Sequence, residues 1–193
     1  VGLLQSCSFD EISKTINDSL KLGSDNNFGY DYLADFEKRF IPKHRLPITT
    51  GWKQIDDICG GGLGKSELGV VIAPTGAGKS FCLVHLGAQG LKEGKVVVHY
   101  TLELGDTIIA TRYDSCLTGY PLFDIINFKD EVYEEIKDID GKLIVKEYPT
   151  KSASTNTIKS HLNKLIKRGI KPGMIIVDYA DLLKPVVVRK EKR

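Results

Sequence analysis

The residues whose types and spacing could do chemistry lie in the stretch Leu-Gly-Val-Val-Ile-Ala-Pro-Thr-Gly-Ala-Gly-Lys-Ser at 68–80. An apolar run leads into a loop of small residues, and residues 81–91 follow with helix-compatible spacing. A strand, loop and helix in this order present backbone N–H groups at a helix N-terminus, where anions bind. The pattern therefore predicts a phosphate-binding P-loop for a nucleoside triphosphate with Mg²⁺.

Each position of this loop has an expected role. Lys79 would reach the β- and γ-phosphates, and the Ser80 hydroxyl would ligate Mg²⁺. Gly76 and Gly78 permit backbone conformations that side chains block. Ala73 replaces the usual first glycine and excludes a strained positive φ there. With ATP and Mg²⁺ as the expected cofactors, the nucleotide-binding residues are Ala73, Pro74, Thr75, Gly76, Ala77, Gly78, Lys79 and Ser80. The alternative is a glycine-rich turn without a ligand.

A second glycine-rich stretch, residues 60–66, also ends in Gly-Lys-Ser. It precedes the apolar run instead of following one, and no helix pattern comes after it. We therefore interpret Gly64-Lys65-Ser66 as part of a turn that feeds a strand at Leu68.

Two carboxylates lie at strand ends. Asp178 ends the apolar run Met174–Asp178, a Walker B pattern that can hold a Mg²⁺-bound water; a turn cap is the alternative. Glu103 follows a strand expected beside the P-loop strand, where it could polarise the attacking water. Its spacing equally allows a surface glutamate at a helix start. His99, inside that strand, is expected to be packed and hydrogen-bonded, and not catalytic.

These residues must be positioned by alternating strands and helices. The strand candidates are continuous apolar runs, which is typical of a parallel sheet covered by helices on both faces. Ligands of such sheets bind at the carboxyl ends of the strands. The fold class is therefore predicted as α/β, with strands at Gly69–Ala73, Lys95–Tyr100, Leu143–Lys146 and Met174–Asp178 and helices at Lys79–Leu91, Asp106–Leu117, Lys129–Ile139 and Thr155–Arg168.

Length and composition limit the remaining choices. A chain of 193 residues fits one α/β domain with an N-terminal extension. A formal net charge of +2 leaves any nucleic-acid contact to local patches. The four cysteines form no CxxC pair, which favours reduced, mostly buried thiols over a metal site. With no signal peptide or long apolar run, we expect a soluble cytoplasmic protein with no membrane partner.

Residues 1–44 are expected to form a linker helix and an extended segment ahead of a core at 45–193. Ser8 and Glu11 have capping-box spacing. A second short helix is expected from Tyr32 to Phe40. The first helix would carry an apolar stripe too narrow to fold alone, made of Phe9, Ile12, Ile16 and Leu20.

Several segments together resemble the RecA-like core of DnaB-type replicative helicases. His99–Leu104 is similar to the family's "FSLEM" segment, Arg112 matches a basic position in the next helix, and Asp178–Leu183 resembles "DYLQLM". The resemblance spans residues 45–185 in the right order. The segments that resemble the beginning of this core are Thr49–Asp56, Gly61-Gly62-Leu63, Glu67-Leu68 and the loop at 73–80.

The resemblance implies a RecA-like P-loop NTPase core. It implies that Lys79 and Ser80 bind phosphate and Mg²⁺, that Asp178 holds Mg²⁺ through water, and that Glu103 is the catalytic base. It further implies a ring, commonly a hexamer, that hydrolyses ATP at subunit interfaces while moving along single-stranded DNA. A primase or helicase loader would be a further partner, and the N-terminal stripe would dock on a neighbouring subunit or on its own domain. The motif residues diverge from the family's usual ones, which suggests a phage-encoded member located in the host cytoplasm.

The sequence differs from the family's pattern in two ways, and these limit which family properties can be expected here. Asp181 stands where the family has a glutamine, and the sequence ends at Arg193, before the family's later strands, DNA-facing loops and arginine finger. We therefore expect a C-terminally truncated piece with weak activity alone. Cations near its end are expected to contact DNA phosphates, with a solvated chain end as the alternative: Arg189, Lys190, Lys192 and Arg193.

Two other functions stay open from sequence. A RecA/RadA-like recombinase or a KaiC-like ATPase would share the phosphate-binding loop, although the motif Tyr-Thr-Leu-Glu-Leu at 100–104 favours the helicase. A non-hydrolysing nucleotide-binding regulatory module would need no placed base, so Glu103 and Asp178 argue against it.

Overall fold

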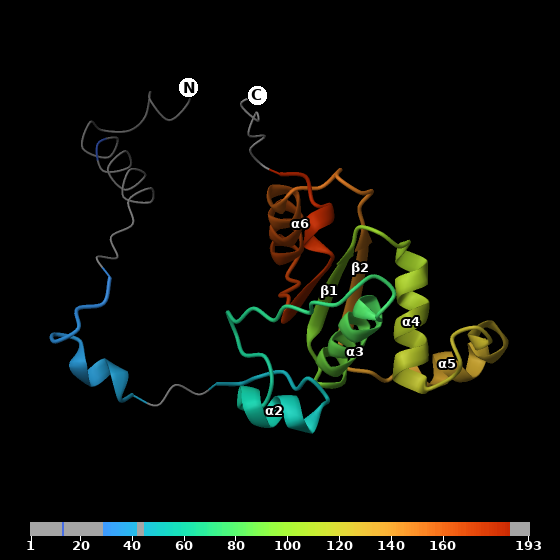
Figure 1. The fold of residues 1–193 in the computed structure, drawn as a ribbon, viewed down its shortest axis with the longest axis horizontal. Coiled ribbons are helices and arrows are strands. Elements are labelled where there is room, and N and C mark those ends of the chain that lie inside the picture. The colour runs from blue at the N-terminus through green and yellow to red at the C-terminus, as the bar shows by residue number, and fades with distance from the viewer. Residues whose placement is uncertain (1–12, 14–28, 42–44, 186–193) are drawn as a thin grey trace. The chain divides into compact units, whose positions relative to one another are not determined.

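Figure 1 presents the computed structural model of the chain, which describes Ser13 and residues 29–41 and 45–185. Contacts divide the chain into two units, Val1–His44 and Arg45–Arg193. In the first unit the 3₁₀ helix η2 (Phe36–Arg39) occupies part of the helix expected at 32–40. The expected apolar stripe at residues 9–20 lies outside the described residues.

The second unit is built on a three-stranded parallel sheet. It comprises β1 (Val96–Thr101), β2 (Lys142–Glu147) and β3 (Met174–Asp178), in the order β2-β1-β3. In this register Thr101 of β1 pairs with Asp178 of β3. Three of the four predicted strands are thus confirmed to within one residue at each end.

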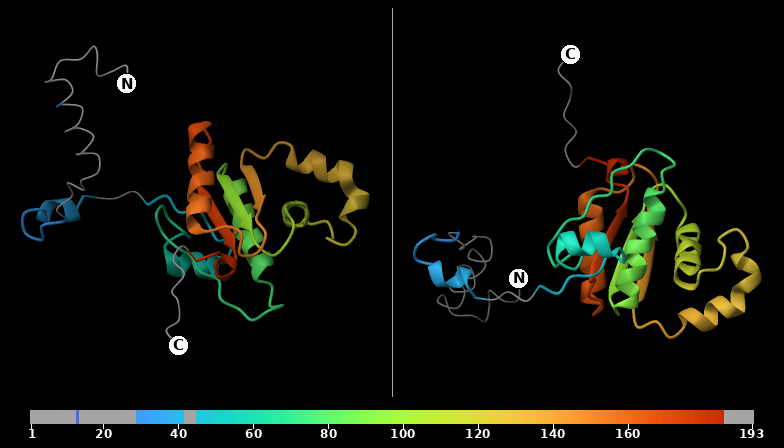
Figure 2. Two further views of the ribbon diagram at one scale, coloured as in Figure 1. Left: turned by 90° about the horizontal axis from the view of Figure 1, so that it is seen from above. Right: turned by 60° about the horizontal axis from the view of Figure 1, so that its bottom comes forward.

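Helices cover both faces of this sheet. α3 (Lys79–Lys92) and α4 (Asp106–Thr118) pack on one face around Val84, Ala88 and Ile109, and α6 (Thr155–Lys167) packs on the other through Ile158 and Leu165 (Figures 1 and 2). The predicted parallel α/β sheet flanked by helices is confirmed. The remaining elements of this unit are α2 (Lys53–Cys59), η3 (Ile125–Phe128), α5 (Lys129–Ile136) and η4 (Ala180–Leu182). α5 ends before the predicted Ile139.

The strand predicted at Gly69–Ala73 does not form. Residues 67–74 have no regular structure, and Leu68, Val70 and Ile72 are exposed. A strand requires a hydrogen-bonding partner, and no strand among residues 45–185 pairs with this run. The two neighbours of β1 are β2 and β3, so the expectation that it neighbours a P-loop strand is wrong for the residues described.

α2 was not expected from the sequence. The Asp56 carboxylate accepts hydrogen bonds from the Thr50 amide (2.8 Å), the Thr50 hydroxyl (2.7 Å) and the Thr49 hydroxyl, and so fastens the helix to the preceding segment. This segment docks on α3, because Trp52 stacks on His85 with ring centroids 4.2 Å apart. The segment at 49–52 is therefore held by side chains at two places, by Asp56 of α2 and by the stacking of Trp52 on α3.

The glycine-rich stretch at 60–66 forms a turn, as predicted, but the strand that it was expected to feed at Leu68 does not form. A Cβ at Gly62 would lie 2.0 Å from the Ile48 carbonyl oxygen, so this glycine permits a close backbone approach. The Arg45 guanidinium donates to the carbonyls of Cys59 (2.7 Å), Gly60 and Gly62 (2.6 Å). It also forms a two-bond pair with Glu67, at 2.8 and 2.6 Å.

We expect Glu67→Gln to lower the thermal midpoint at neutral pH, because it breaks the Arg45 pair that holds this turn. Hydrogen bonds from Arg45 and the Gly64 amide lower the pKa of Glu67 to about 2. A depressed pKa stabilises the fold above the unfolded-state value and loses that contribution as pH falls toward about 2. The difference between wild type and variant should therefore shrink in thermal melts from pH 7 to pH 3.

The matched control is Asp57→Asn, which breaks the exposed Lys53–Asp57 pair (2.7 Å) within α2. Exposed pairs of this kind contribute little, so we expect a small, pH-insensitive change. An equal, pH-independent loss in both variants would contradict the role assigned to Glu67.

The structure also bears on the expectations about the cysteines and about membrane-spanning segments. Cys59 is exposed, which contradicts the expectation of mostly buried thiols, whereas Cys82 and Cys116 are half-buried. Cys7 lies outside the described residues. Across the described ranges, no helix is both long enough and apolar enough to cross a bilayer.

Candidate functional site

The predicted site residues share one edge of the sheet. α3 packs on β1 and β3, and only residues 93–95 connect it to β1. A helix joined to the next strand so tightly and packed along it must run antiparallel to that strand. The N-terminus of α3, which carries Lys79 and Ser80, therefore lies at the carboxyl edge, where Asp178 ends β3.

The loop before α3 contains two glycines with left-handed backbones. Gly76 and Gly78 have φ values of +80° and +89°, and a Cβ at either would meet only open space. Ala73 has no positive φ, consistent with its side chain. No side chain caps the first turn of α3, so its backbone N–H groups remain available to an anion.

The Lys79 ammonium is folded back onto its own loop. Its Nζ donates to the carbonyl oxygens of Ala73 and Pro74, each at 3.0 Å. These two bonds keep the cation beside the open loop, where it can exchange carbonyl oxygens for those of an anion.

Asp178 is a buried carboxylate without a hydrogen-bond partner. The residue is 1% exposed, and neither carboxylate oxygen accepts a hydrogen bond from any described residue. Leaving such a group unpaired is costly, and structural carboxylates are normally satisfied. The turn-cap alternative is therefore wrong, because a capping carboxylate accepts a backbone bond.

Glu103 is placed two residues beyond β1. The Leu102 amide donates to the Asp178 carbonyl at 2.9 Å, which ties the backbone before Glu103 to the end of β3. The Glu103 side chain is exposed and makes no hydrogen bond or ion pair within the described residues. It therefore lies near the carboxyl edge, exposed to solvent.

His99 is fully buried, and its Nδ1 lies 2.9 Å from the Tyr113 hydroxyl of α4, so the prediction of a packed, hydrogen-bonded histidine is confirmed. Arg112 lies over the Phe81 ring, 4.3 Å from its centroid, and joins α4 to the first turn of α3. Sequence reasoning missed Tyr113. The sequence feature that could have indicated its role is a tyrosine on the inward side of the helix predicted at Asp106–Leu117. Arg189, Lys190, Lys192 and Arg193 lie outside the described residues.

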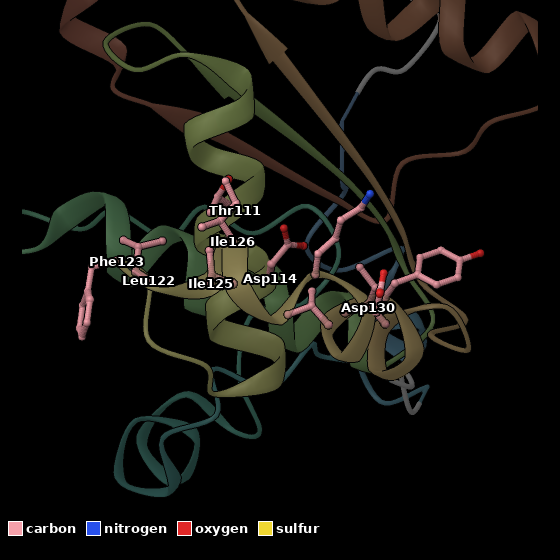
Figure 3. A pocket seen from close by; sticks show the side chains of 11 residues that line it. Thr111, Asp114, Leu122, Phe123, Ile125, Ile126 and Asp130 are labelled. Atoms are coloured by element: carbon pink, nitrogen blue, oxygen red, sulfur yellow. The ribbon is translucent and has the colours of Figure 1, made fainter.

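A separate hollow of about 680 Å³ opens between α4, η3 and α5 (Figure 3). Its walls are largely apolar and include Phe123 and Ile126, which are exposed. None of the predicted site residues lines it, so it is distinct from the carboxyl edge.

The residues at this edge fit a Mg²⁺-bound triphosphate. The open glycine loop and uncapped α3 N-terminus suit phosphate oxygens, and the unpartnered Asp178 suits a cation or its bound water. Ser80 lies in the first turn of α3, where its hydroxyl would be a ligand for Mg²⁺.

Comparisons with known proteins identify the family and the fold of the chain. Residues 47–193 match the family model of the DnaB-like helicase C-terminal domain. A DnaB-like replicative helicase of Enterobacteria phage T4 is 32% identical over 190 residues, covering 92% of this chain and 40% of that protein. The chain thus spans about two fifths of the length of this curated relative.

Two solved structures share the fold. One, described as a DnaB-like replicative helicase and its interactions with primase, has a TM-score of 0.64 at 15% identity, covering 93% of this chain and 45% of that one. The other, described as an ATPase domain, has a TM-score of 0.61 at 18% identity, covering 95% and 61%. With a family model that matches most of its length and a fold shared with these two structures, the chain belongs to the family of DnaB-like helicase C-terminal domains.

Proposed function

We propose that this chain is the ATP-dependent motor core of a ring-forming replicative DNA helicase, which couples hydrolysis of Mg-ATP to movement along single-stranded DNA. The observation that carries the proposal is the carboxyl edge of the sheet. There an open glycine loop, an uncapped helix start and a buried, unpartnered Asp178 meet. Membership of the DnaB-like helicase family supports this edge as the nucleotide site.

The chain's own residues take distinct parts in this function. Lys79 and the backbone of residues 73–80 bind the phosphates, while Ser80 and Asp178 hold Mg²⁺, the latter through water. Bound Mg²⁺ supplies positive charge that stabilises the transferring phosphoryl group. Glu103 orients the attacking water and accepts its proton.

Family membership also supports a set of proposed partners. We expect a homo-oligomeric ring, most simply a hexamer, with single-stranded DNA at its centre and Arg189, Lys190, Lys192 and Arg193 among its DNA contacts. One relative is described with primase, so a primase, or a helicase loader, is a reasonable further partner here.

The assembly provides the test. The natural gene product that contains these 193 residues should form closed rings with Mg²⁺ and a non-hydrolysable ATP analogue, seen by negative-stain electron microscopy. It should also hydrolyse ATP faster when single-stranded DNA is added. Filaments on DNA without closed rings would favour a RecA/RadA-like recombinase instead. Nucleotide binding without turnover would favour a regulatory module.

A further inference from the structure

The face of the sheet below α3 carries a second buried polar group beside Asp178. Side chains alternate between the faces of a strand, so His99 and Thr101 of β1 share a face. Because Thr101 pairs with Asp178, that face also holds the Asp178 carboxylate. His99 and Asp178 are therefore diagonal neighbours on adjacent strands.

Both groups are left unpartnered on one side. His99 is fully buried and its Nδ1 meets the Tyr113 hydroxyl, but its Nε2 has no hydrogen-bond partner among the described residues. Neither Asp178 oxygen has one there. A ring nitrogen and a carboxylate are complementary when the nitrogen carries a proton, and pairing would remove the cost of burying both.

The Tyr113 hydroxyl orients the imidazole for this pairing. When that hydroxyl donates to Nδ1, which lies 2.9 Å away, the proton of a neutral ring is on Nε2, the nitrogen that has no partner among the described residues.

A glycine in α3 makes room for the Tyr113 hydroxyl. A Cβ at Gly87 of α3 would lie 2.0 Å from the Tyr113 hydroxyl oxygen. Glycine costs about 1 kcal/mol relative to alanine inside a helix. Gly87 therefore gives up helix stability at a point where α3 must admit this hydroxyl.

We propose that His99 is a positioning residue for Asp178: Tyr113 orients the imidazole, and its Nε2–H donates to one buried water that in turn donates to the Asp178 carboxylate. The bond fixes the direction in which the carboxylate presents its remaining lone pairs. This inference rests on the proposed function, in which those lone pairs hold Mg²⁺ through water. A hydrogen bond behind a metal-binding group commonly changes metal affinity or activity about 10–100-fold when it is lost.

The hydrogen bond can be tested without nucleotide. In the 193-residue chain, long-range ¹H–¹⁵N spectra of the histidine rings should identify His99 as the Nε2-protonated tautomer. Asp178→Asn should shift the Nε2 resonance, and Tyr113→Phe should shift Nδ1. An Nδ1-protonated tautomer, or an Nε2 resonance unmoved by Asp178→Asn, would overturn the proposal.

The effect on the metal is tested with a matched pair of variants. His99→Leu should weaken Mg²⁺-dependent binding of a fluorescent ATP analogue about 10-fold or more, while its binding in EDTA changes little. The control is His161→Leu, because His161 Nδ1 makes the corresponding bond to Tyr100 (2.8 Å) on the opposite face of β1. A purely structural role predicts that both variants lose stability and neither changes the Mg²⁺ dependence, and that result would reject positioning.

Failure of this inference can be distinguished from failure of the proposed function. A folded wild-type chain that binds no Mg-nucleotide contradicts the proposed function. The tautomer and its response to Asp178→Asn are measured in the absence of nucleotide, so they decide the hydrogen bond in either case.

Discussion

Replacing Lys79 with alanine is expected to lower DNA-stimulated ATP hydrolysis by the natural gene product at least about 100-fold, because one preorganised cationic donor to the reacting phosphate is lost. The ammonium already lies at the loop, bound to the carbonyls of Ala73 and Pro74 at 3.0 Å each. It needs only to exchange these neutral acceptors for phosphate oxygens. Nucleotide affinity should fall as well, since Lys79 contacts the phosphates before the reaction begins.

The chain contains a natural control for this variant. Lys65 occupies the same place in a Gly-Lys-Ser triplet, but it belongs to the turn held by Arg45 and is followed by no helix. Lys65→Ala should leave nucleotide binding and turnover unchanged. Thermal melts of both variants separate a lost phosphate contact from a disturbed loop. Equal turnover in wild type and Lys79→Ala would remove this loop from the mechanism.

Local patterns predicted most of the fold. The apolar run at Met174–Asp178 and the helix that begins at Lys79 lie where the sequence places them, because strand and helix periodicity are properties of a few consecutive residues. α2 was missed because its anchor is Asp56, which is bonded to Thr49 and Thr50 across six or seven residues. Such contacts between side chains and a preceding segment leave no periodic signal.

The run at 69–73 shows the opposite failure. Its composition is that of a buried strand, but Val70 and Ile72 are exposed, because no strand among residues 45–185 pairs with it. Composition records what a segment can form, whereas pairing depends on which partner lies alongside.

The candidate site was predictable where its residues are adjacent in sequence and not where they come from different elements. Lys79 and Ser80 follow from one loop motif. The pairing of His99 with Tyr113, and the need for glycine at Gly87, depend on how α4 and α3 pack on β1. No spacing rule connects these three positions.

The second large effect is expected at Glu103. Glu103→Gln keeps the size of the side chain and removes its basicity, so turnover by the natural gene product should fall about 10²–10⁴-fold while Mg-ATP affinity stays near that of wild type. This separation of binding from turnover distinguishes a base from a phosphate ligand, and it is the opposite of the expectation for Lys79→Ala, which loses both.

The position of Glu103 makes this test selective. The Leu102 amide bonds to the Asp178 carbonyl at 2.9 Å, so the backbone is fixed beside the proposed metal-binding carboxylate, while the exposed Glu103 side chain has no partner among residues 45–185 to hold it elsewhere. Asp106, in the first turn of α4, offers a matched acidic control three residues away. If the carboxylate served only to favour the α4 N-terminus, Asp106→Asn and Glu103→Gln would each change stability by a few tenths of a kcal/mol, on the order of a helix-dipole effect, and both would retain turnover. A loss of turnover confined to Glu103→Gln requires a base at that position, and turnover retained by both variants would place the base elsewhere.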